Sequence, residues 1–355
     1  MMTETKELPF VTIIMPIRNE AGYIERSLGA VLSQNYPPER MEVLVIDGMS
    51  TDGTREIVKR MMDHTTTESR LQTTDTPVLI LLDNPSLIVP TALNIGLKHA
   101  RGDVIIRVDG HCEIAPDYVR RCVEVLQQTG ADCVGGLTMT VGGTWVTKAI
   151  ALAQSSPFGV GGVAFRTGRK HGSYVDTVAF GAYRREVFDR IGGFDEELVR
   201  NQDDEFNFRL IQAGGKIWLD PSIRSVYYSR ASLKSLWRQY FQYGFYKVRV
   251  IQKRKAVPSW RHLVPATFVL GLAGSILLAI ITVQPLWALC VAGPYALANL
   301  LASLWTARKD WKTLPLLPLA FATLHLSYGI GFLWGLWYWR SKWLEGRHCP
   351  FASDR

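Results

Sequence analysis

The sequence predicts an α/β domain with a mostly parallel, Rossmann-like sheet, followed by C-terminal transmembrane helices. Three observations lead to this prediction. Over residues 1–130, short continuous apolar runs alternate with amphipathic stretches, as in a parallel sheet that helices cover on both faces. Polar and mostly acidic residues follow the apolar runs at their ends. Residues 264–338 are nearly all apolar, whereas the chain before them mixes charged and apolar residues.

The elements of the α/β domain follow from hydrophobic periodicity. We expect strands at residues 10–15, 43–46, 78–82 and 104–108, and helices at residues 23–34, 54–62, 90–100 and 116–128. Proline suits the first turn of a helix, and Pro90 and Pro116 begin the last two helices. Further along, residues 206–213 continue a short helix and residues 216–219 form a strand. Residues 138–174 lack periodicity, so we expect a mobile loop on the substrate side.

The apolar C-terminal region predicts about three membrane spans, because each segment is close to the ~20 residues that cross a bilayer core. The expected spans are residues 264–283, 285–305 and 314–338. Residues 233–250 mix aromatic side chains with Arg, Gln and Lys, and predict a helix at the membrane surface; an aromatic-rich core helix is the alternative. The expected domains are residues 1–230 (water-soluble), 231–262 (interfacial helix and linker), 263–339 (transmembrane) and 340–355 (polar tail).

The basic residues near the spans make the predicted topology inconsistent. If the soluble domain is inside, the loop with Arg308 and Lys309 is also inside, as the positive-inside rule requires. A third full span would place Arg340 and Lys342 outside, against the rule. A re-entrant hairpin around residues 325–331 is an alternative that returns the tail inside.

Composition excludes several classes of protein. The formal net charge of +8 is moderate, and the basic residues cluster at the spans, which favours anionic lipid headgroups over nucleic acid. The 5 cysteines show no CxxC spacing, so we expect neither structural zinc nor a disulfide framework. The polar N-terminus has no apolar h-region, so we expect no signal peptide and a cytosolic soluble domain.

Candidate ligand-binding residues follow the expected strands, because open α/β sheets bind ligands at the carboxyl ends of their strands. Glu20, Asp47, Asp83 and Asp109 follow four successive strands. No GxGxxG follows the first strand and no GxxxxGK[ST] is present, which argues against dinucleotide oxidoreductases and P-loop NTPases. A phosphate-bearing ligand would then need a divalent metal ion, for which Asp109 and His111 offer a carboxylate and an imidazole.

Residues 10–130 resemble the family 2 glycosyltransferases, which are inverting enzymes with the nucleotide-diphospho-sugar transferase fold. The matching segments are Val11-Thr-Ile-Ile-Met-Pro-Ile-Arg-Asn-Glu20, Val45-Ile-Asp-Gly-Met-Ser-Thr-Asp-Gly-Thr54, Ala92-Leu-Asn-Ile-Gly-Leu97, Arg101-Gly-Asp103, Gly192-Gly-Phe-Asp195, Gln202-Asp-Asp-Glu205 and Arg209-Leu210. More narrowly, Asp109-Gly-His111, Asn201-Gln-Asp-Asp-Glu205 and the three-span tail resemble the succinoglycan-type exopolysaccharide glucosyltransferases of bacteria.

The resemblance implies roles for the donor side of the site. Donor nucleotide binding would fall to Pro16, Glu20, Asp47, Asp83, Lys98 and Asp109. Asp109 and His111 would bind Mn²⁺ or Mg²⁺; His111 stands where the family usually has Asp, which favours Mn²⁺. Arg107 and Arg209 are candidates to assist the diphosphate, although both suit structural roles equally well.

The resemblance also implies a general base and an acceptor side. Asp203 would be the base, with Asp204 as the second candidate. The acceptor side would include Gly181, Gln202, Arg238 and Gln239. Without the resemblance, residues 202–205 would suggest only a helix N-terminus whose acidic side chains favour the helix dipole.

The implied function is a multi-pass enzyme of the inner (plasma) membrane with a cytosolic catalytic domain. It would move a hexose, with UDP-glucose as the implied donor, to a lipid-linked oligosaccharide in exopolysaccharide or cell-surface glycan synthesis. Membrane lipids and other glycosyltransferases of the pathway are the expected partners. Alternatives are a polyprenyl-phosphate glycosyltransferase, a non-catalytic sugar-nucleotide-binding scaffold, and a processive synthase, although residues 237–246 lack the Gln-x-x-Arg-Trp motif of processive enzymes.

Overall fold

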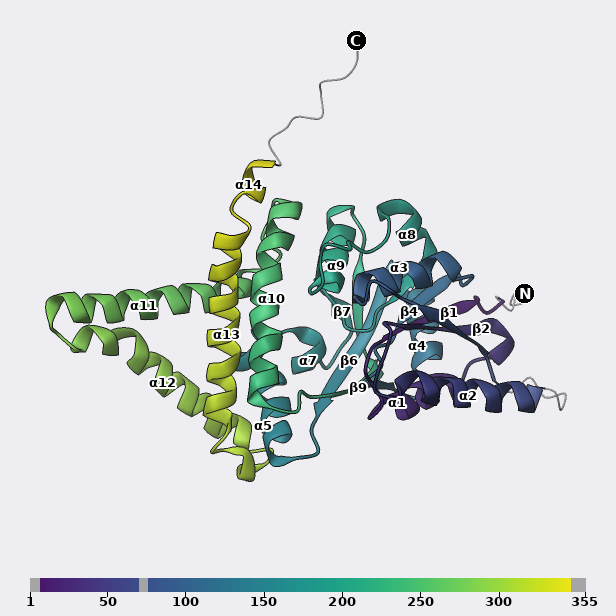
Figure 1. Cartoon of the computed structure of the whole chain (residues 1–355), viewed down its shortest axis with the longest axis horizontal. Coiled ribbons are helices and arrows are strands. Elements are labelled where there is room, and N and C mark those ends of the chain that lie inside the picture. The colour runs from purple at the N-terminus through teal and green to yellow at the C-terminus, as the bar shows by residue number, and fades with distance from the viewer. Residues whose placement is uncertain (1–6, 70–75, 346–355) are drawn as a thin grey trace, which may run out of the picture. The chain divides into compact units, whose positions relative to one another are not determined.

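The computed structural model describes residues 7–69 and 76–345, which form two compact units (Figure 1). The sheet unit comprises Met1–Met139 and Ala164–Tyr228, and the helical unit comprises Thr140–Val163 and Ser229–Arg355. The division differs from the expected boundary at residue 230, because Thr140–Val163 packs with the helical unit. Much of the expected polar tail, residues 346–355, lies outside the described residues.

The sheet unit contains one mixed sheet with the strand order β3-β2-β1-β4-β8-β6-β9-β5, and β7 also pairs with β9. The strands are β1 (Val11–Ile17), β2 (Met41–Asp47), β3 (Val78–Asp83), β4 (Val104–Arg107), β5 (Cys112–Ile114), β6 (Cys133–Val141), β7 (Ser173–Tyr174), β8 (Ala182–Arg184) and β9 (Ile217–Tyr228). The pairs β3–β2, β2–β1 and β1–β4 are parallel, which confirms the predicted fold class. The pairs β4–β8, β8–β6, β9–β5 and β7–β9 are antiparallel.

Helices cover both faces of this sheet because successive residues of its central strands point to opposite sides. On one face, Ile13 and Met15 of β1 pack with α1, α2 and α4; on the other, Ile14 packs with α3, α8 and α9. The helices of the unit are α1 (Ile24–Leu32), η1 (Pro38–Arg40), α2 (Thr54–Ser69), α3 (Val89–His99), α4 (Tyr118–Thr129), α7 (Ala164–Thr167), α8 (Arg185–Ile191) and α9 (Gln202–Gln212).

The helical unit is built from α5 (Trp145–Gln154), α6 (Pro157–Val160), α10 (Leu233–Arg254), η2 (Trp260–His262), α11 (Val264–Thr282), α12 (Leu286–Ala307), η3 (Trp311–Thr313), α13 (Leu317–Tyr338) and α14 (Lys342–Glu345). Three helices are long and apolar enough to cross a membrane: Trp260–Thr282, Leu286–Ala307 and Leu317–Tyr338. The three expected apolar C-terminal helices are thus confirmed. In Figure 1, α11 and α12 form a hairpin, and α10 and α13 lie side by side.

One alternative and one expectation for these segments are wrong. Helix α13 is continuous through residues 325–331, so no re-entrant hairpin forms there. Residues 138–174 are not an irregular loop, because β6, α5, α6 and α7 occupy most of them. Helix α5 begins with a capping box between Thr144 and Thr147, a signal that does not depend on apolar periodicity.

Candidate active site

The ends of β1, β2 and β3 bring two of the predicted acidic residues together. Strand register places Asp47 opposite Ile17 and opposite Asp83. Arg55, in the first turn of α2, joins the two carboxylates: its Nη1 lies 3.1 Å from Asp47 Oδ2 and 2.5 Å from Asp83 Oδ1. The Asp47 side chain is fully buried, whereas 56% of the Asp83 side chain is exposed. Asp83 is therefore the member of this group that a ligand can reach.

The loop after β1 is attached to the loop after β2. Asn19 has a positive φ of 55°, and its amide oxygen accepts a hydrogen bond from the Thr51 N–H at 2.9 Å. Its own N–H donates to Ser50 Oγ at 2.9 Å, and the Glu20 N–H donates to Thr54 Oγ1 at 2.8 Å. These bonds hold Glu20 in place just after β1. Pro16 lies within that strand, four residues before Glu20.

Arg107 connects the end of β4 with the start of α9. Its Nε donates to Asp109 Oδ1 at 2.8 Å and its Nη2 donates to Asp109 Oδ2 at 3.1 Å. Its Nη1 lies 3.8 Å from Asp203 Oδ2 and makes no hydrogen bond within the described part of the chain. Burial alone would lower the pKa of Arg107, but the charges of Asp109 and Asp203 raise it. The three groups therefore form one charged cluster around a buried guanidinium.

His111 forms a second ionisable pair in the same unit. Its Nδ1 lies 2.7 Å from Glu20 Oε1, and its ring packs edge-on against Tyr227. Burial would lower the pKa of His111, but Tyr227, the hydrogen bond to Glu20 and the nearby charges raise the pKa to about 9. With Nδ1–H donated to Glu20, Nε2 is the nitrogen that remains for a ligand; because the raised pKa keeps the ring protonated at neutral pH, Nε2 must release its proton when it binds a metal ion. A carboxylate oriented in this way is typical of metal-binding histidines.

Helix α9 places the predicted base at its N-terminus. Asp203 is 44% exposed, and its Oδ1 accepts the Asp204 N–H at 2.9 Å. Gln202 is buried, and within the described residues its Oε1 has no hydrogen-bond partner. The carboxylate of Asp203 is thus open to a ligand while its position is held by the helix start.

Arg209, the other candidate for the diphosphate, has a structural role. Its Nε lies 3.1 Å from Glu205 Oε1, and its two terminal nitrogens donate to the backbone oxygens of Ile191 and Gly193. The guanidinium also lies over the ring of Phe206. These partners commit Arg209 to holding the turn after α8, and only Arg107 joins the acidic cluster.

The structure does not bring Lys98 to the site. Lys98 is exposed in the last turn of α3, close to Arg101, whose Nε lies 2.7 Å from Glu42 Oε2 near the beginning of β2. Asp47 lies at the other end of β2. The reason is geometric: a helix that follows a parallel strand runs back along the sheet, so its last turn returns to the opposite edge.

The predicted acceptor residues are divided between the units. The Gly181 carbonyl accepts the Arg107 N–H at 3.3 Å, and a Cβ at Gly181 would lie 2.8 Å from the Tyr183 ring, so this glycine makes room beside the cluster. Arg238 and Gln239 belong to α10 in the helical unit. There, Arg238 is exposed, and the buried Gln239 donates to the Tyr243 hydroxyl at 2.9 Å.

Three side chains of the site were not predicted. Arg55 bridges Asp47 and Asp83, Tyr227 packs on His111, and the Arg166 guanidinium lies 5.4 Å from the centre of the Tyr227 ring. Arg55 had a usable signal, because it is the second residue of the helix that follows the Asp47 loop. Tyr227 and Arg166 had none, because they lie more than fifty residues from the elements that they join.

The residues present can hold a divalent ion only with help from a ligand. Across residues 7–69 and 76–345, no group of three or more His, Cys, Asp and Glu side chains could hold a metal ion. Asp109 and His111 supply one carboxylate oxygen donor and one imidazole nitrogen donor, a set that suits Mn²⁺. The Glu20–His111 bond provides the outer partner that such histidines need. The set therefore fits an ion that shares its other positions with water and diphosphate oxygens.

Comparison with known proteins assigns the family. The family model "Glycosyl transferase family 2" matches residues 12–192. The chain is 36% identical over 335 residues to the succinoglycan biosynthesis protein ExoA of Rhizobium meliloti (strain 1021), covering 93% of this chain and 95% of ExoA.

More distant relatives are also glycosyltransferases. A dolichyl N-acetyl-alpha-D-glucosaminyl phosphate 3-beta-D-2,3-diacetamido-2,3-dideoxy-beta-D-glucuronosyltransferase of Methanococcus voltae is 30% identical over 250 residues, covering 69% of this chain and 74% of that protein. The solved structure of the mannosyltransferase PcManGT from Pyrobaculum calidifontis, in complex with GDP-Man and Mn²⁺, superposes with a TM-score of 0.59 at 22% identity, over 94% of this chain and 88% of that one. The last likeness supports the fold.

Proposed function

Because the chain belongs to glycosyl transferase family 2, we propose that it moves a hexose from a nucleotide-diphosphate sugar to a lipid-linked oligosaccharide, with inversion at the anomeric carbon. The observation that carries this proposal is the Arg107 cluster. One buried guanidinium holds Asp109, from the donor side, within the same group as Asp203, from the acceptor side. A transferase needs these two functions next to each other.

Asp203 is the general base of the proposed reaction. Its half-exposed carboxylate takes the proton from an acceptor hydroxyl while that oxygen forms a bond to the anomeric carbon. The bond from this carbon to the diphosphate oxygen breaks in the same displacement, and the nucleotide diphosphate leaves. A positioned base of this kind contributes about 10²–10⁴-fold to the rate. The buried Gln202 Oε1 is suited to accept a hydrogen bond from a second hydroxyl of the acceptor.

The donor binds at the ends of β1 to β4 in this proposal. Asp83 and its ion-pair partner Arg55 bind the nucleotide. Arg107 presents a positive charge toward the diphosphate. Asp109 and His111 would hold a divalent ion, which when bound neutralises the developing charge of the leaving diphosphate. PcManGT was solved in complex with Mn²⁺, which supports this choice of ion. Glu20 orients the imidazole.

The names of two relatives support different parts of this proposal. The Methanococcus protein is named for a dolichyl-phosphate-linked sugar, which supports a lipid-linked acceptor, and ExoA is named for succinoglycan biosynthesis, which supports exopolysaccharide synthesis. We therefore assign this chain to exopolysaccharide or cell-surface glycan synthesis at the plasma membrane, with UDP-glucose as the first donor to test. The sheet unit faces the cytosol in this proposal, where nucleotide sugars are made.

The test is sugar transfer by membranes that contain the full-length protein. Labelled UDP-glucose, other nucleotide sugars and an extracted pool of polyprenyl-linked acceptors are supplied with and without Mn²⁺. We expect transfer by the wild type, loss of about 10²–10⁴-fold in Asp203→Asn, and normal transfer by Asp189→Asn, an exposed residue of α8. Nucleotide binding without transfer from any donor would reject the enzyme proposal. Wild-type activity of Asp203→Asn would reject the assigned base, and transfer to polyprenyl phosphate alone would change the acceptor.

A further inference from the structure

Helix α10 lies along α13 over nearly the full length of both helices. Near their beginnings, Leu236 and Tyr240 share a buried cluster with Phe321 and Leu324. In the middle, a Cβ on Gly244 would overlap the backbone of Tyr328, so the two helices approach closely. Near their ends, Gln252 Nε2 donates to the Trp339 carbonyl at 2.9 Å. Whatever depth α13 has in a membrane, α10 therefore shares it.

The composition of α10 is incompatible with the bilayer interior. Its 22 residues include six basic side chains and no acidic one: Lys234, Arg238, Lys247, Arg249, Lys253 and Arg254. Charged side chains are costly and rare in the hydrocarbon core, and those within membrane helices face a protein interior or water. If α13 crossed the bilayer, the half-buried Arg249 would be drawn into it with α10.

A second contact indicates on which side of the membrane α13 begins, namely the side that holds the sheet unit. His325 Nε2 lies 2.8 Å from the Phe158 carbonyl oxygen, and the rings of Phe158 and Phe321 pack edge to face. Phe158 belongs to Thr140–Val163, whose chain leaves the sheet unit and returns to it. A crossing needs about 20 residues in each direction, so this segment is too short to cross the bilayer and come back. The part of α13 that packs on it must remain on the same side.

The α11–α12 hairpin has the opposite character. Within the 18-residue windows of the candidate spans, 6% of α11 and 11% of α12 are buried, against 44% of α13. The 19 residues of α11 extend about 28 Å, close to the ~30 Å hydrocarbon core. Both open ends meet the Thr140–Val163 segment: Arg261 approaches Gly161, and Thr306 Oγ1 lies 3.5 Å from Ser156 Oγ.

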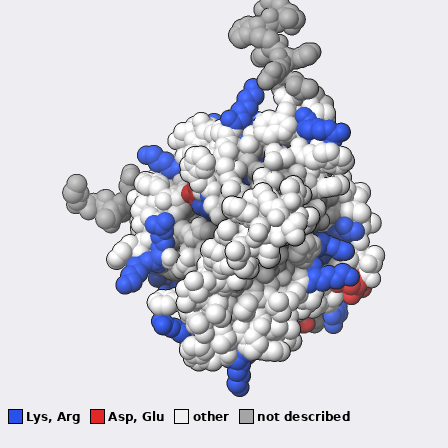
Figure 2. All heavy atoms as spheres, turned by 90° about the vertical axis from the view of Figure 1, so that its left-hand side faces the viewer, with Lys and Arg blue, Asp and Glu red and all other residues white. Residues whose placement is uncertain are grey.

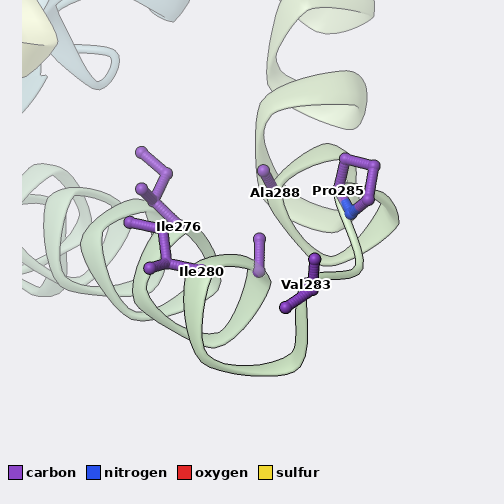
Figure 3. Close-up of a pocket in the computed structure, with 6 residues that line it drawn as sticks. Ile276, Ile280, Val283, Pro285 and Ala288 are labelled. Atoms are coloured by element: carbon purple, nitrogen blue, oxygen red, sulfur yellow. The ribbon is translucent and has the colours of Figure 1, made fainter.

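The turn of the hairpin is apolar and exposed. Val283 is 84% exposed, and the apolar side chains beside it line a notch between the two helices (Figure 3). The lining residues are Ile276, Ala279, Ile280, Val283, Pro285 and Ala288. Figure 2 views the side toward which this turn points in Figure 1, and uncharged atoms fill the centre of that view. An acyl chain is the natural occupant of such a notch.

We propose that only the α11–α12 hairpin enters the bilayer and that α13 lies with α10 at the membrane surface. The exposed aromatic side chains of α13, such as Trp334 and Trp337, then rest at the headgroup boundary, where tryptophan is favoured. Basic side chains of α10 meet anionic headgroups. The chain crosses the bilayer twice rather than three times, and Arg340 and Lys342 remain on the side of the sheet unit. This arrangement satisfies the positive-inside rule, and it is independent of the reaction that the enzyme catalyses.

The experiment is cysteine labelling of the full-length protein in sealed membranes. Cys290 and Cys349 are first replaced by serine; Cys112, Cys122 and Cys133 are buried. Single cysteines are then introduced at three exposed positions: Lys59→Cys on α2, Gln284→Cys in the hairpin turn and Ser341→Cys after α13. A membrane-impermeant maleimide is applied to right-side-out vesicles, inverted vesicles and vesicles opened with detergent. Equal labelling in detergent shows that each cysteine is reactive.

We expect Lys59→Cys and Ser341→Cys to be labelled from the same side. Gln284→Cys is expected to be labelled from the other side only. Labelling of Gln284→Cys only in detergent, or from the side of Lys59→Cys, would overturn the two crossings, because the hairpin would then not reach the other side. Labelling of Ser341→Cys from the side opposite Lys59→Cys overturns it, because α13 would then cross the membrane.

Discussion

Replacing Arg107 with methionine tests whether the charged cluster holds the site together. The change keeps most of the side-chain volume and removes the charge. Asp109 then loses two charge-assisted hydrogen bonds, at 2.8 and 3.1 Å, while its side chain stays only 19% exposed. Breaking a buried ion pair from one side costs about 3–5 kcal/mol. Because both partners keep some contact with solvent, we expect the lower limit, about 3 kcal/mol.

The Asp203 contact adds little to this loss. At 3.8 Å, two unit charges interact by about 4 kcal/mol at an effective dielectric constant of 20 and about 1 kcal/mol in water. Asp203 is 44% exposed, so the value in water is the better guide. Loss of the Asp203 contact in Arg107→Met should therefore change the free energy of unfolding very little. Its main effects should be a shifted Asp203 carboxylate and a lower transfer rate.

The assay is chemical unfolding of the full-length protein in detergent, followed by fluorescence. Arg190→Met is the matched control, because Arg190 Nη2 lies 2.6 Å from Asp132 Oδ1 but its side chain is 46% exposed. A surface pair of this kind contributes about 0–1 kcal/mol. If Arg107→Met lowers the free energy of unfolding no more than Arg190→Met does, Asp109 does not depend on Arg107 and the cluster argument is refuted.

Two further substitutions test other parts of the structure. Glu20→Gln should weaken Mn²⁺ binding about 10–100-fold, because His111 loses the carboxylate that orients it. Mn²⁺ titration followed by electron paramagnetic resonance measures the affinity, and Glu25→Gln, at an exposed position, is the control. Equal Mn²⁺ affinities of the two variants would contradict the prediction. Gly244→Ala should destabilise the helical unit by about 1–3 kcal/mol, because its Cβ overlaps the Tyr328 backbone. Gly274→Ala in α11 has open space and should be neutral in the same thermal unfolding experiment; similar effects of both changes would disprove close packing of α10 on α13.

Much of the parallel half of the sheet could be predicted from local pattern. Strands buried on both faces are continuous apolar runs, and the runs at residues 10–15 and 43–46 correspond to β1 and β2. The antiparallel half of the sheet was harder to predict from the sequence. Strands β7 and β8 have 2 and 3 residues, too few for a period to be read. Residues 140–163 were misread because their partners, such as Phe321 and His325, lie far along the chain.

The candidate site divides in the same way. Asp47 and Asp83 could be placed together from sequence, because parallel strands end at one edge of the sheet. Lys98 was assigned to the donor side only by the resemblance, and it lies in the last turn of α3, which runs back along the sheet. Arg107 and Arg209 each pair with an acidic residue close in sequence, Asp109 and Glu205. Arg107 also reaches Asp203, and that contact depends on α9 lying beside the end of β4.

The sequence by itself determined the fold class, the family and the three apolar C-terminal helices, because periodicity, strand-end motifs and apolar length are local properties of the chain. Only the tertiary structure decided which charges meet: Glu20 with His111 across 91 positions, and Arg107 with Asp203. It also distinguished α13 from α11 and α12. All three helices are apolar enough to span, but α13 alone packs along a basic helix, and that contact depends on side chains more than seventy residues apart.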